Sequence, residues 1–517
     1  MFPSKIIIYL FSVFLSFSLW SDKPNVVFIL LDDMGYSDIG CYGGEIETPN
    51  IDSLAAGGMR FTQMHNTSKC FPSRAALLTG LYAQQCGFGH YFKKFKHAVT
   101  LAEVLKSVGY RTFASGKHHS EESLYDRGFD HCFGLLDGAT NHFNPGFQRE
   151  GEEKPIQKKY GQRRWAIDQE VLIPYTPVDK DFYSTDIYTK YALKYLEKCK
   201  EDNSPFFLYL SYTAPHDPLQ AWEVDIQKYE ETYKKGYEFI RNARYDKMSK
   251  LGVIDRRDPL SYPIHKSWTS LSANQQKAEA RRMAVYAAMI DSVDQNIGKI
   301  IKKLDAIGKR ENTIVFFASD NGASSETPEF AIHKAGRRAG DGLPVEVIGS
   351  STYWASQGPN WANVSNTPFR SYKNSSYEGG ICTPFIVSWP NEIKNPGTIN
   401  KDYPAHFIDI MATLIDATGA KYPTIWNEDD IKPYEGESLL PILLENGSNT
   451  RSKPIFWQWN RGMAVREGKW KAVAQNNQWE LFNMEEDFTE TKNLDDQHPE
   501  ILHRLKSLHW NWLSNCR

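Results

Sequence analysis

The chain has 517 residues, with 60 Lys or Arg against 63 Asp or Glu and a formal net charge of −3. This near balance of charge argues against a general nucleic-acid-binding protein, so we expect no nucleic-acid partner. The length leaves room for one large α/β domain and a smaller second domain.

The N-terminal segment has the pattern of a signal peptide. Lys5 precedes an apolar run from Ile6 to about Phe17, and small and polar residues follow it. A membrane anchor is the alternative, but the run is shorter than the ~20 apolar residues that a spanning helix needs. We therefore expect residues 1–21 to be removed, and the mature protein to be periplasmic or secreted with no membrane contact.

Five short apolar runs, each bounded by polar or turn-forming residues, predict the buried strands of a parallel sheet. They are residues 25–33, 111–117, 205–216, 312–322 and 383–390. Helical patterns lie between them, including residues 100–110, with Thr100 as N-cap and Gly109 as stop, and residues 283–308. The alternation of strand and helix predicts an α/β fold, with a doubly wound, mostly parallel sheet and helices on both faces.

Polar side chains follow four of these strands at their carboxyl ends. They are Asp32 and Asp33, Lys117 and His119, His216, and Asp320 and Asn321. Ligands of open α/β sheets bind outside this edge, so we expect these side chains to meet in one cleft. A single such residue is more often an ordinary loop residue, but four coincident cases favour a site.

The residue types in this cleft favour a hard cation and an oxyanion. Three carboxylates and one amide oxygen suit Ca²⁺ or Mg²⁺. The cationic or proton-donating side chains are Lys117, His119, His216 and, from a later segment, Lys373. Cations gathered around a metal are typical of a site for a tetrahedral oxyanion ester, and sulfate and phosphate both satisfy this pattern.

The segment SKCFPSRAALLTG (residues 68–80) contains a cysteine in an unusual setting. Pro72 suits the first turn of a helix, so we expect Cys70 at a helix N-terminus, where backbone N–H groups favour an anion. A disulfide between Cys70 and Cys86 is the alternative. The chain has seven cysteines, so at least one of them lies outside any internal disulfide.

The run from Cys70 to Gly80, with its C-x-P-S-R core, resembles the signature of the type I sulfatases closely. In that family a maturation enzyme reads this core and oxidises the cysteine to formylglycine. GYRTFASGKHH (109–119) resembles the second signature, although His118 stands where an apolar or aromatic residue is common. APHDPLQ, ASDNG and the segment around Lys373 resemble further blocks, so the similarity to a bacterial arylsulfatase-like member covers nearly the whole mature chain.

This resemblance implies an alkaline-phosphatase-like catalytic domain over residues 22–448. A smaller C-terminal α+β domain over residues 449–517 would contain a small antiparallel sheet and a helix. The implied activity is that of an exported sulfatase, which hydrolyses sulfate esters of carbohydrates and accepts aryl sulfates as surrogate substrates.

The resemblance also implies roles for individual residues. One Ca²⁺ would be bound by Asp32, Asp33, Asp320, Asn321 and the formylglycine at position 70. Arg74 would orient the hydrated aldehyde. Sulfate oxygens would be bound by Lys117, His216 and Lys373, with His216 or Lys373 protonating the leaving alcohol, and His119 would accept a proton.

Two other functions stay open. Relatives that hydrolyse phosphonate monoesters or phosphodiesters share formylglycine and this metal site. A non-catalytic binder of sulfated glycans could also descend from the same scaffold, although the cysteine and the carboxylates of the family are all present here.

Overall fold

The computed structural model describes residues 23–157, 162–255, 258–328, 338–339, 342–445 and 450–516. The predicted signal peptide and the predicted domain boundary near residue 448 lie outside these ranges. Within them, no helix combines the length and the apolar character that crossing a membrane requires.

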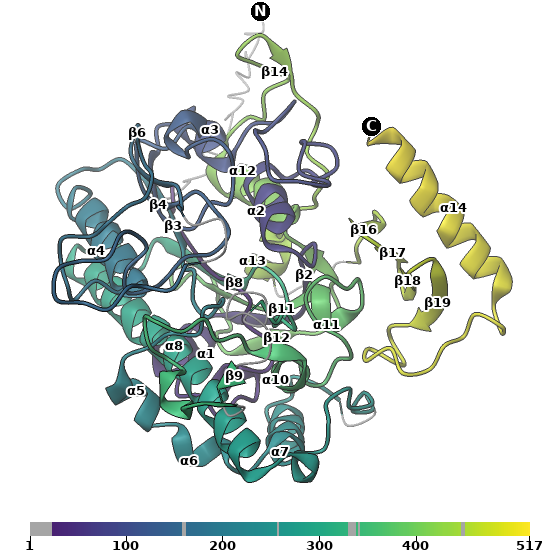
Figure 1. Cartoon of the computed structure of the whole chain (residues 1–517). Coiled ribbons are helices and arrows are strands. Elements are labelled where there is room, and N and C mark those ends of the chain that lie inside the picture. The colour runs from purple at the N-terminus through teal and green to yellow at the C-terminus, as the bar shows by residue number, and fades with distance from the viewer. Residues whose placement is uncertain are drawn as a thin grey trace, which may run out of the picture.

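A central sheet of 11 strands organises most of the chain (Figure 1). The strand order is β12-β2-β11-β8-β1-β7-β3-β4-β5-β6, and β13 pairs with β2. The strands are β1 (Asn25–Leu31), β2 (Met59–His65), β3 (Arg111–Gly116), β4 (His131–Leu135), β5 (Trp165–Ile167), β6 (Glu170–Leu172), β7 (Phe206–Ser211), β8 (Thr313–Ser319), β11 (Cys382–Ser388), β12 (Thr398–Asn400) and β13 (Ala405–His406). There are two further two-stranded sheets: a parallel pair of β9 (Arg338–Ala339) and β10 (Gly342–Leu343), and an antiparallel pair of β14 (Ile425–Trp426) and β15 (Asp429–Asp430).

All five predicted strands are present, and β8, β1, β7 and β3 are parallel neighbours as expected. The fifth, β11, is antiparallel to both β2 and β8, so the expectation of a parallel strand there is wrong. An apolar run reports burial on both faces of a sheet and says nothing about strand direction, which depends on how the chain enters the strand.

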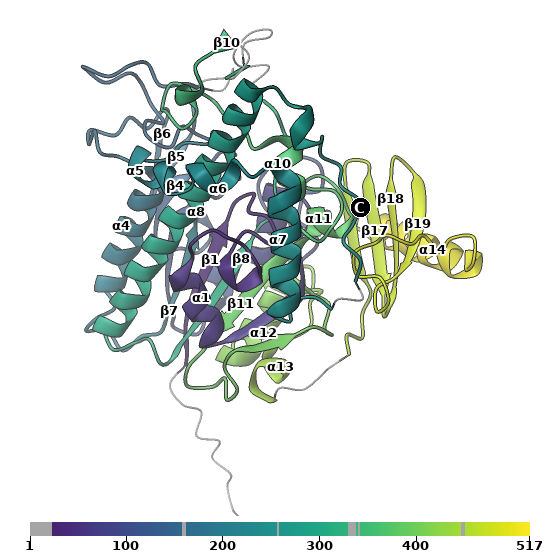
Figure 2. The ribbon, with the colours of Figure 1, turned by 90° about the horizontal axis from the view of Figure 1, so that it is seen from below.

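Successive residues of β1 point into two separate cores, one on each face of the sheet. Val27 and Ile29 lie in a core with α1, α4 and α8, whereas Val26 and Phe28 lie in a core with α2, α3 and α12 (Figure 2). These helices are α1 (Pro49–Ala56), α2 (Cys70–Thr79), α3 (Leu101–Lys106), α4 (Ser184–Glu197), α8 (Ala273–Ala306) and α12 (Asp409–Thr418). The others are α5 (Glu223–Gln227), α6 (Glu230–Tyr233), α7 (Tyr237–Lys250), α10 (Gly358–Ser365), α11 (Glu378–Ile381) and α13 (Leu440–Glu445). The doubly wound arrangement is therefore confirmed.

Helix ends follow their capping residues. Thr100 caps α3 in a capping box with Glu103, as its position in the sequence predicts. The helix expected over residues 283–308 begins earlier, at Ala273, because Ser272 and Gln275 form a capping box there. The polar first turns of α8 carry too few apolar residues to be recognised by periodicity alone.

The C-terminal part forms a second small layer beside the main body (Figure 1). Four antiparallel strands, β16 (Ile455–Trp459), β17 (Gly462–Glu467), β18 (Trp470–Gln475) and β19 (Gln478–Asn483), pack against α14 (Pro499–Asn515). Phe456 and Trp512 stack across this contact with ring centroids 4.8 Å apart. The expected small antiparallel sheet and helix are confirmed, whereas the domain limits stay a prediction.

A fully buried ionic cluster joins this small sheet to the main body. Lys471 of β18 lies 2.6 Å from Glu378 Oε1 and 2.7 Å from Glu490 Oε1, and His65 of β2 lies 2.9 Å from Glu378 Oε2. All four side chains have no exposed surface. Burial and the charge of Glu378 raise the pKa of Glu490 to about 7, so Lys471 faces one firmly ionised carboxylate and one that titrates near neutrality.

We expect Lys471→Met to destabilise the fold strongly. The change leaves two buried carboxyl groups without their cation, and removing one partner of a buried pair costs about 3–5 kcal/mol. Urea unfolding followed by tryptophan fluorescence measures the loss. Glu490→Gln is the matched control, because Lys471 keeps Glu378 and the amide oxygen can still accept from the Glu378 N–H. Equal stability of Lys471→Met and the parent protein would show that the cluster does not hold the two parts together.

Candidate active site

The four central strands deliver the predicted polar residues to one edge of the sheet. In the order β8, β1, β7 and β3, these residues are Asp320 and Asn321, Asp32 and Asp33, His216, and Lys117 and His119. Parallel neighbours end at the same edge, so the side chains converge as expected. The backbone N–H of Asp33 donates to Asp320 Oδ1 at 3.3 Å, which ties the ends of β1 and β8 together.

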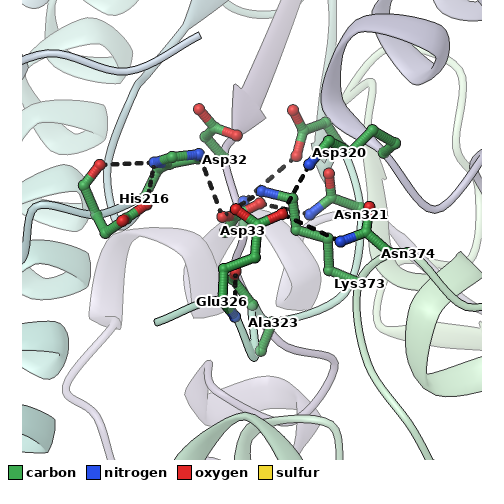
Figure 3. Close-up of polar contacts among 12 residues, drawn as sticks. Asp32, Asp33, His216, Asp320, Asn321, Ala323, Glu326, Lys373 and Asn374 are labelled. Carbon is green, nitrogen blue, oxygen red and sulfur yellow. Dashed lines mark hydrogen bonds and ion pairs between the residues drawn. The ribbon is translucent and has the colours of Figure 1, made fainter. Parts of the chain in front are cut away.

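Asp33 lies at the centre of this group (Figure 3). Asn321 Nδ2 donates to Asp33 Oδ1 at 2.6 Å and Lys373 Nζ donates to Asp33 Oδ2 at 2.7 Å, while His216 Nε2 lies 3.5 Å from the same oxygen. Burial disfavours the charged carboxylate, but the positive charges of Lys373 and His216 hold the pKa of Asp33 below its usual value. Burial lowers the pKa of His216, but the negative charges of Asp33 and Asp32 outweigh this effect and raise the pKa to about 9.

Arg74 of α2 is buried, and its guanidinium spans three elements. Its Nε and Nη2 donate to Asp320 Oδ2 at 3.0 and 2.7 Å, and its Nη1 donates to the backbone oxygen of Lys117 at 2.9 Å. Nη1 also donates to Ser211 Oγ at the end of β7. Arg74 thus locks the N-terminal half of α2 onto the ends of β8, β7 and β3.

Lys117 Nζ donates to Asp32 Oδ2, and both side chains are fully buried. The site therefore has two lysine–aspartate pairs, one at Asp32 and one at Asp33. Both lysines are far in the sequence from the aspartates that they contact. Lys117 follows the end of β3, and Lys373 lies in the loop before α11.

The oxygens of this site fit a hard divalent cation. Asp32 Oδ1 and Asn321 Oδ1 are buried and accept no hydrogen bond from the described residues. A buried oxygen without a donor is costly, whereas a bound cation satisfies it. Asp32, Asp33 and His216 also present ligand atoms within 4.8 Å of one another. Burial and the charge of Asp32 raise the pKa of Asp320 to about 6 despite Arg74, which is the crowding of carboxylates that a cation relieves.

Cys70 is the first residue of α2, as its sequence predicts, and 2% of it is exposed. All seven cysteines are free, so the alternative of a Cys70–Cys86 disulfide is not found. Burial opposes ionisation of Cys70, yet the charges of Lys117, Lys373 and Lys69 lower the pKa of its thiol. Burial raises the pKa of the other six cysteines. Cys70 alone thus lies in an environment that favours an anion.

The two adjacent histidines after β3 have different surroundings. His119 packs its ring against Phe71 and Phe92, at centroid distances of 5.5 and 5.0 Å, and so lies beside the residue that follows Cys70. His118 packs against Phe95, and its two ring nitrogens have no hydrogen-bond partner among the described residues. The chain is not extended here, since His119 has a φ of 64°, so its placement comes from this turn and not from strand alternation.

Three further residues complete the site and were not predicted. Asp217 Oδ1 lies 2.8 Å from His216 Nδ1 and orients the imidazole. Ser211 Oγ accepts a hydrogen bond from Arg74 Nη1. Glu326 Oε1 lies 2.8 Å from Lys69 Nζ. Asp217 directly follows His216 in the sequence, which could have signalled its role. Ser211 and Glu326 carry no such signal, because only the fold brings them to their partners.

Family models and curated proteins match most of this chain. Residues 24–420 match the family model described as Sulfatase, and residues 371–511 match N-sulphoglucosamine sulphohydrolase, C-terminal. The arylsulfatase of Klebsiella aerogenes is 34% identical, over 81% of this chain and 92% of that protein. The N-acetylgalactosamine-6-sulfatase of Mus musculus is 28% identical, over 91% of this chain and 76% of that protein.

Solved structures share the fold. Ps i-CgsB in complex with k-i-k-neocarrahexaose superposes with a TM-score of 0.69 at 24% identity, covering 96% of this chain and 94% of that one. The phosphonate monoester hydrolase of Agrobacterium radiobacter has a TM-score of 0.60 at 17% identity, covering 96% of each chain. The predicted alkaline-phosphatase-like α/β fold class is therefore confirmed. The sequence matches decide further: the chain belongs to the sulfatase family and is a sulfuric ester hydrolase.

We expect His119→Ala to lose most of the activity and His118→Ala to keep it. Burial and the charges of Lys117 and Arg74 hold the pKa of His119 well below its usual value, so its neutral imidazole can accept a proton beside residue 70. Loss of a positioned base lowers kcat by about 10²–10⁴-fold. Steady-state hydrolysis of 4-nitrophenyl sulfate measures both variants. An inactive His118→Ala beside an active His119→Ala would exchange the roles assigned to the two rings.

Proposed function

We propose that this chain is an exported sulfatase that hydrolyses sulfate esters of carbohydrates through a formylglycine at position 70 and one bound Ca²⁺. The observation that carries the proposal is Cys70 itself. It combines an intact C-x-P-S-R core, a place at the N-terminus of α2 and an electrostatic environment that no other cysteine of the chain has.

The surroundings of residue 70 suit a hydrated aldehyde. Such a hydrate supplies a nucleophilic hydroxyl and a second hydroxyl through which the carbonyl can be regenerated. The N-terminus of α2 and the ammonium groups of Lys117 and Lys373 favour negative charge at this position. A formylglycine-generating enzyme is the partner that this modification requires.

The residues of this chain divide the remaining work. Lys117 and Lys373 bind sulfate oxygens and offset the charge of the transferring group, because both ammonium groups lie at the carboxylate cluster. His216 or Lys373 donates a proton to the leaving alcohol, because His216 Nε2 and Lys373 Nζ both lie at Asp33 Oδ2 in the same buried site. Asp217 holds the His216 ring in place, and neutral His119 accepts a proton near residue 70.

Asp32, Asp33, Asp320 and Asn321 are the residues that would hold Ca²⁺. Their carboxylate and amide oxygens match the ligands that calcium prefers, and two of these oxygens lack a hydrogen-bond donor. A bound calcium ion would add a fixed positive charge against the sulfate oxygens.

The names of similar proteins support a sulfated carbohydrate as substrate. One relative is an N-acetylgalactosamine-6-sulfatase, and one structural neighbour is complexed with k-i-k-neocarrahexaose. Hydrolysis of phosphonate monoesters is the alternative activity, because a hydrolase of that class shares the fold. The rates on 4-nitrophenyl sulfate and on phenyl phenylphosphonate, measured side by side, separate the two activities, and a higher kcat/KM on the phosphonate would overturn the proposal.

Active protein should carry an aldehyde at position 70. Peptide mass spectrometry of the fragment around Ser68–Arg74 should show the mass of formylglycine in place of cysteine, and reaction with a hydrazine probe should confirm the aldehyde. Cys86→Ala is the matched control and should keep both the modification and the activity. Full turnover by protein whose Cys70 is entirely unmodified would contradict the mechanism.

Removal of calcium should abolish activity, and its return should restore it. Asp32→Asn should weaken calcium binding by at least about tenfold in calorimetry, because the substitution removes the charge of a direct ligand. Asp294→Asn makes the same change at a buried carboxylate of α8, outside the cluster, and should bind calcium as the parent protein does. Unchanged turnover in metal-stripped protein would count against the assignment.

A further inference from the structure

A cavity lies beside the active site, where the small C-terminal sheet meets the main body. It has a volume of about 820 Å³. Three parts of the chain line it: the loop that follows α2, the two turns that end β16 and β18, and the last turns of α14. The C-terminal end of α14 approaches this loop in Figure 1.

The charged side chains that line this cavity are basic. Lys93, Lys96 and Arg461 line it, and none of them forms an ion pair with a carboxylate of the described residues. Within the part of the chain that the structure describes, the Arg461 side chain makes one polar contact, in which Nη1 donates to the amide oxygen Oδ1 of Asn476 at 3.5 Å. The chain as a whole has a net charge of −3, so this local surplus of cations is not a general property of its surface.

Exposed aromatic rings accompany these cations. Tyr91 and Trp510 line the cavity with 72% and 47% of their surface exposed. Amide side chains, among them Asn476 and Asn477, also line the cavity. Flat rings pack on the apolar faces of sugars, amides pair with hydroxyl groups, and unpaired cations bind sulfate groups. The combination fits an anionic saccharide better than an apolar ligand.

The wall of this cavity is continuous with the wall of the active site. Tyr91 and Lys93 flank Phe92, whose ring contacts His119. Asn460 and Arg461 directly follow Trp459, whose ring lies 5.1 Å from that of Phe71, next to Cys70. Trp459 Nε1 also donates to Asn374 Oδ1 at 3.0 Å, beside Lys373. A saccharide that leaves the active site over Trp459 therefore reaches these cations.

We propose that this cavity is a subsite for the units of a sulfated saccharide that adjoin the one being hydrolysed. The inference rests on the proposed function for the reaction, but the binding of a polyanion here does not require turnover. It predicts that the enzyme prefers a chain with several sulfate groups over a singly sulfated sugar.

The test compares a cavity variant with a matched surface variant. The cavity variant is Lys93→Ala, Lys96→Ala and Arg461→Ala. The control is Lys190→Ala, Lys200→Ala and Lys302→Ala, which removes the same charge from exposed positions on α4, just after α4 and on α8. Calorimetry with a dextran sulfate oligosaccharide measures binding, and 4-nitrophenyl sulfate measures the chemical step on a substrate too small to reach the cavity.

The cavity variant should bind dextran sulfate at least about tenfold more weakly than the parent protein, since it loses three cations that contact the ligand. Its kcat/KM for 4-nitrophenyl sulfate should stay within about twofold, and the control variant should bind normally. Trp510→Ala should weaken binding without changing its dependence on salt, because it removes stacking and not charge.

Unchanged binding by the cavity variant would overturn the inference. So would an equal loss of binding to a thymidine oligonucleotide, because the cavity would then be a general polyanion surface. If the parent protein binds dextran sulfate through these residues but hydrolyses no sulfate ester, the proposed function fails and the subsite stands.

Discussion

Three carboxylates buried at one edge of the sheet are the constraint on which this structure depends. The negative charges of Asp32, Asp33 and Asp320 repel one another, and burial by itself favours the neutral form of Asp33 and of Asp320. Arg74, Lys117 and Lys373 offset this charge, and each comes from a different segment of the chain. The fold must therefore deliver three cations to the carboxylates before the site can exist. Each buried carboxylate is stabilised by one of these cations. Loss of one cation therefore leaves a buried negative charge without a partner, which costs more than the loss of one contact.

This requirement explains why the small C-terminal sheet matters to a site that lies in the main body. The segment that supplies Lys373 to Asp33 also supplies Glu378 to Lys471, only five residues later. Trp459 of the same sheet donates to Asn374. The segment is thus held from both sides, by Asp33 at one end and by the C-terminal sheet at the other. A lysine on a free loop would lose conformational freedom on binding sulfate, whereas this one is placed in advance.

The same contact surface gives the active site its outer wall. The rings of Phe71 and Phe92 pack against His119, and the ring of Trp459 packs against Phe71, the residue after Cys70. The active site and the cavity proposed for further sulfated units are thus adjacent, but they differ in the burial and pairing of their charged groups. Buried charges that form ion pairs surround the reaction centre. The cavity is lined by cations without an ion-pair partner among the described residues and by the exposed aromatic rings of Tyr91 and Trp510.

The sequence by itself determined the strands, the residues at their carboxyl ends and the place of Cys70, because these follow from local pattern. A short apolar run bounded by polar residues predicts a buried strand, and proline in a first turn places Cys70 at a helix start. Only the tertiary structure decided the direction of β11 and that Ser211 and Glu326 belong to the site. These outcomes depend on strand pairing and on contacts between residues more than a hundred positions apart, and no local pattern records such contacts.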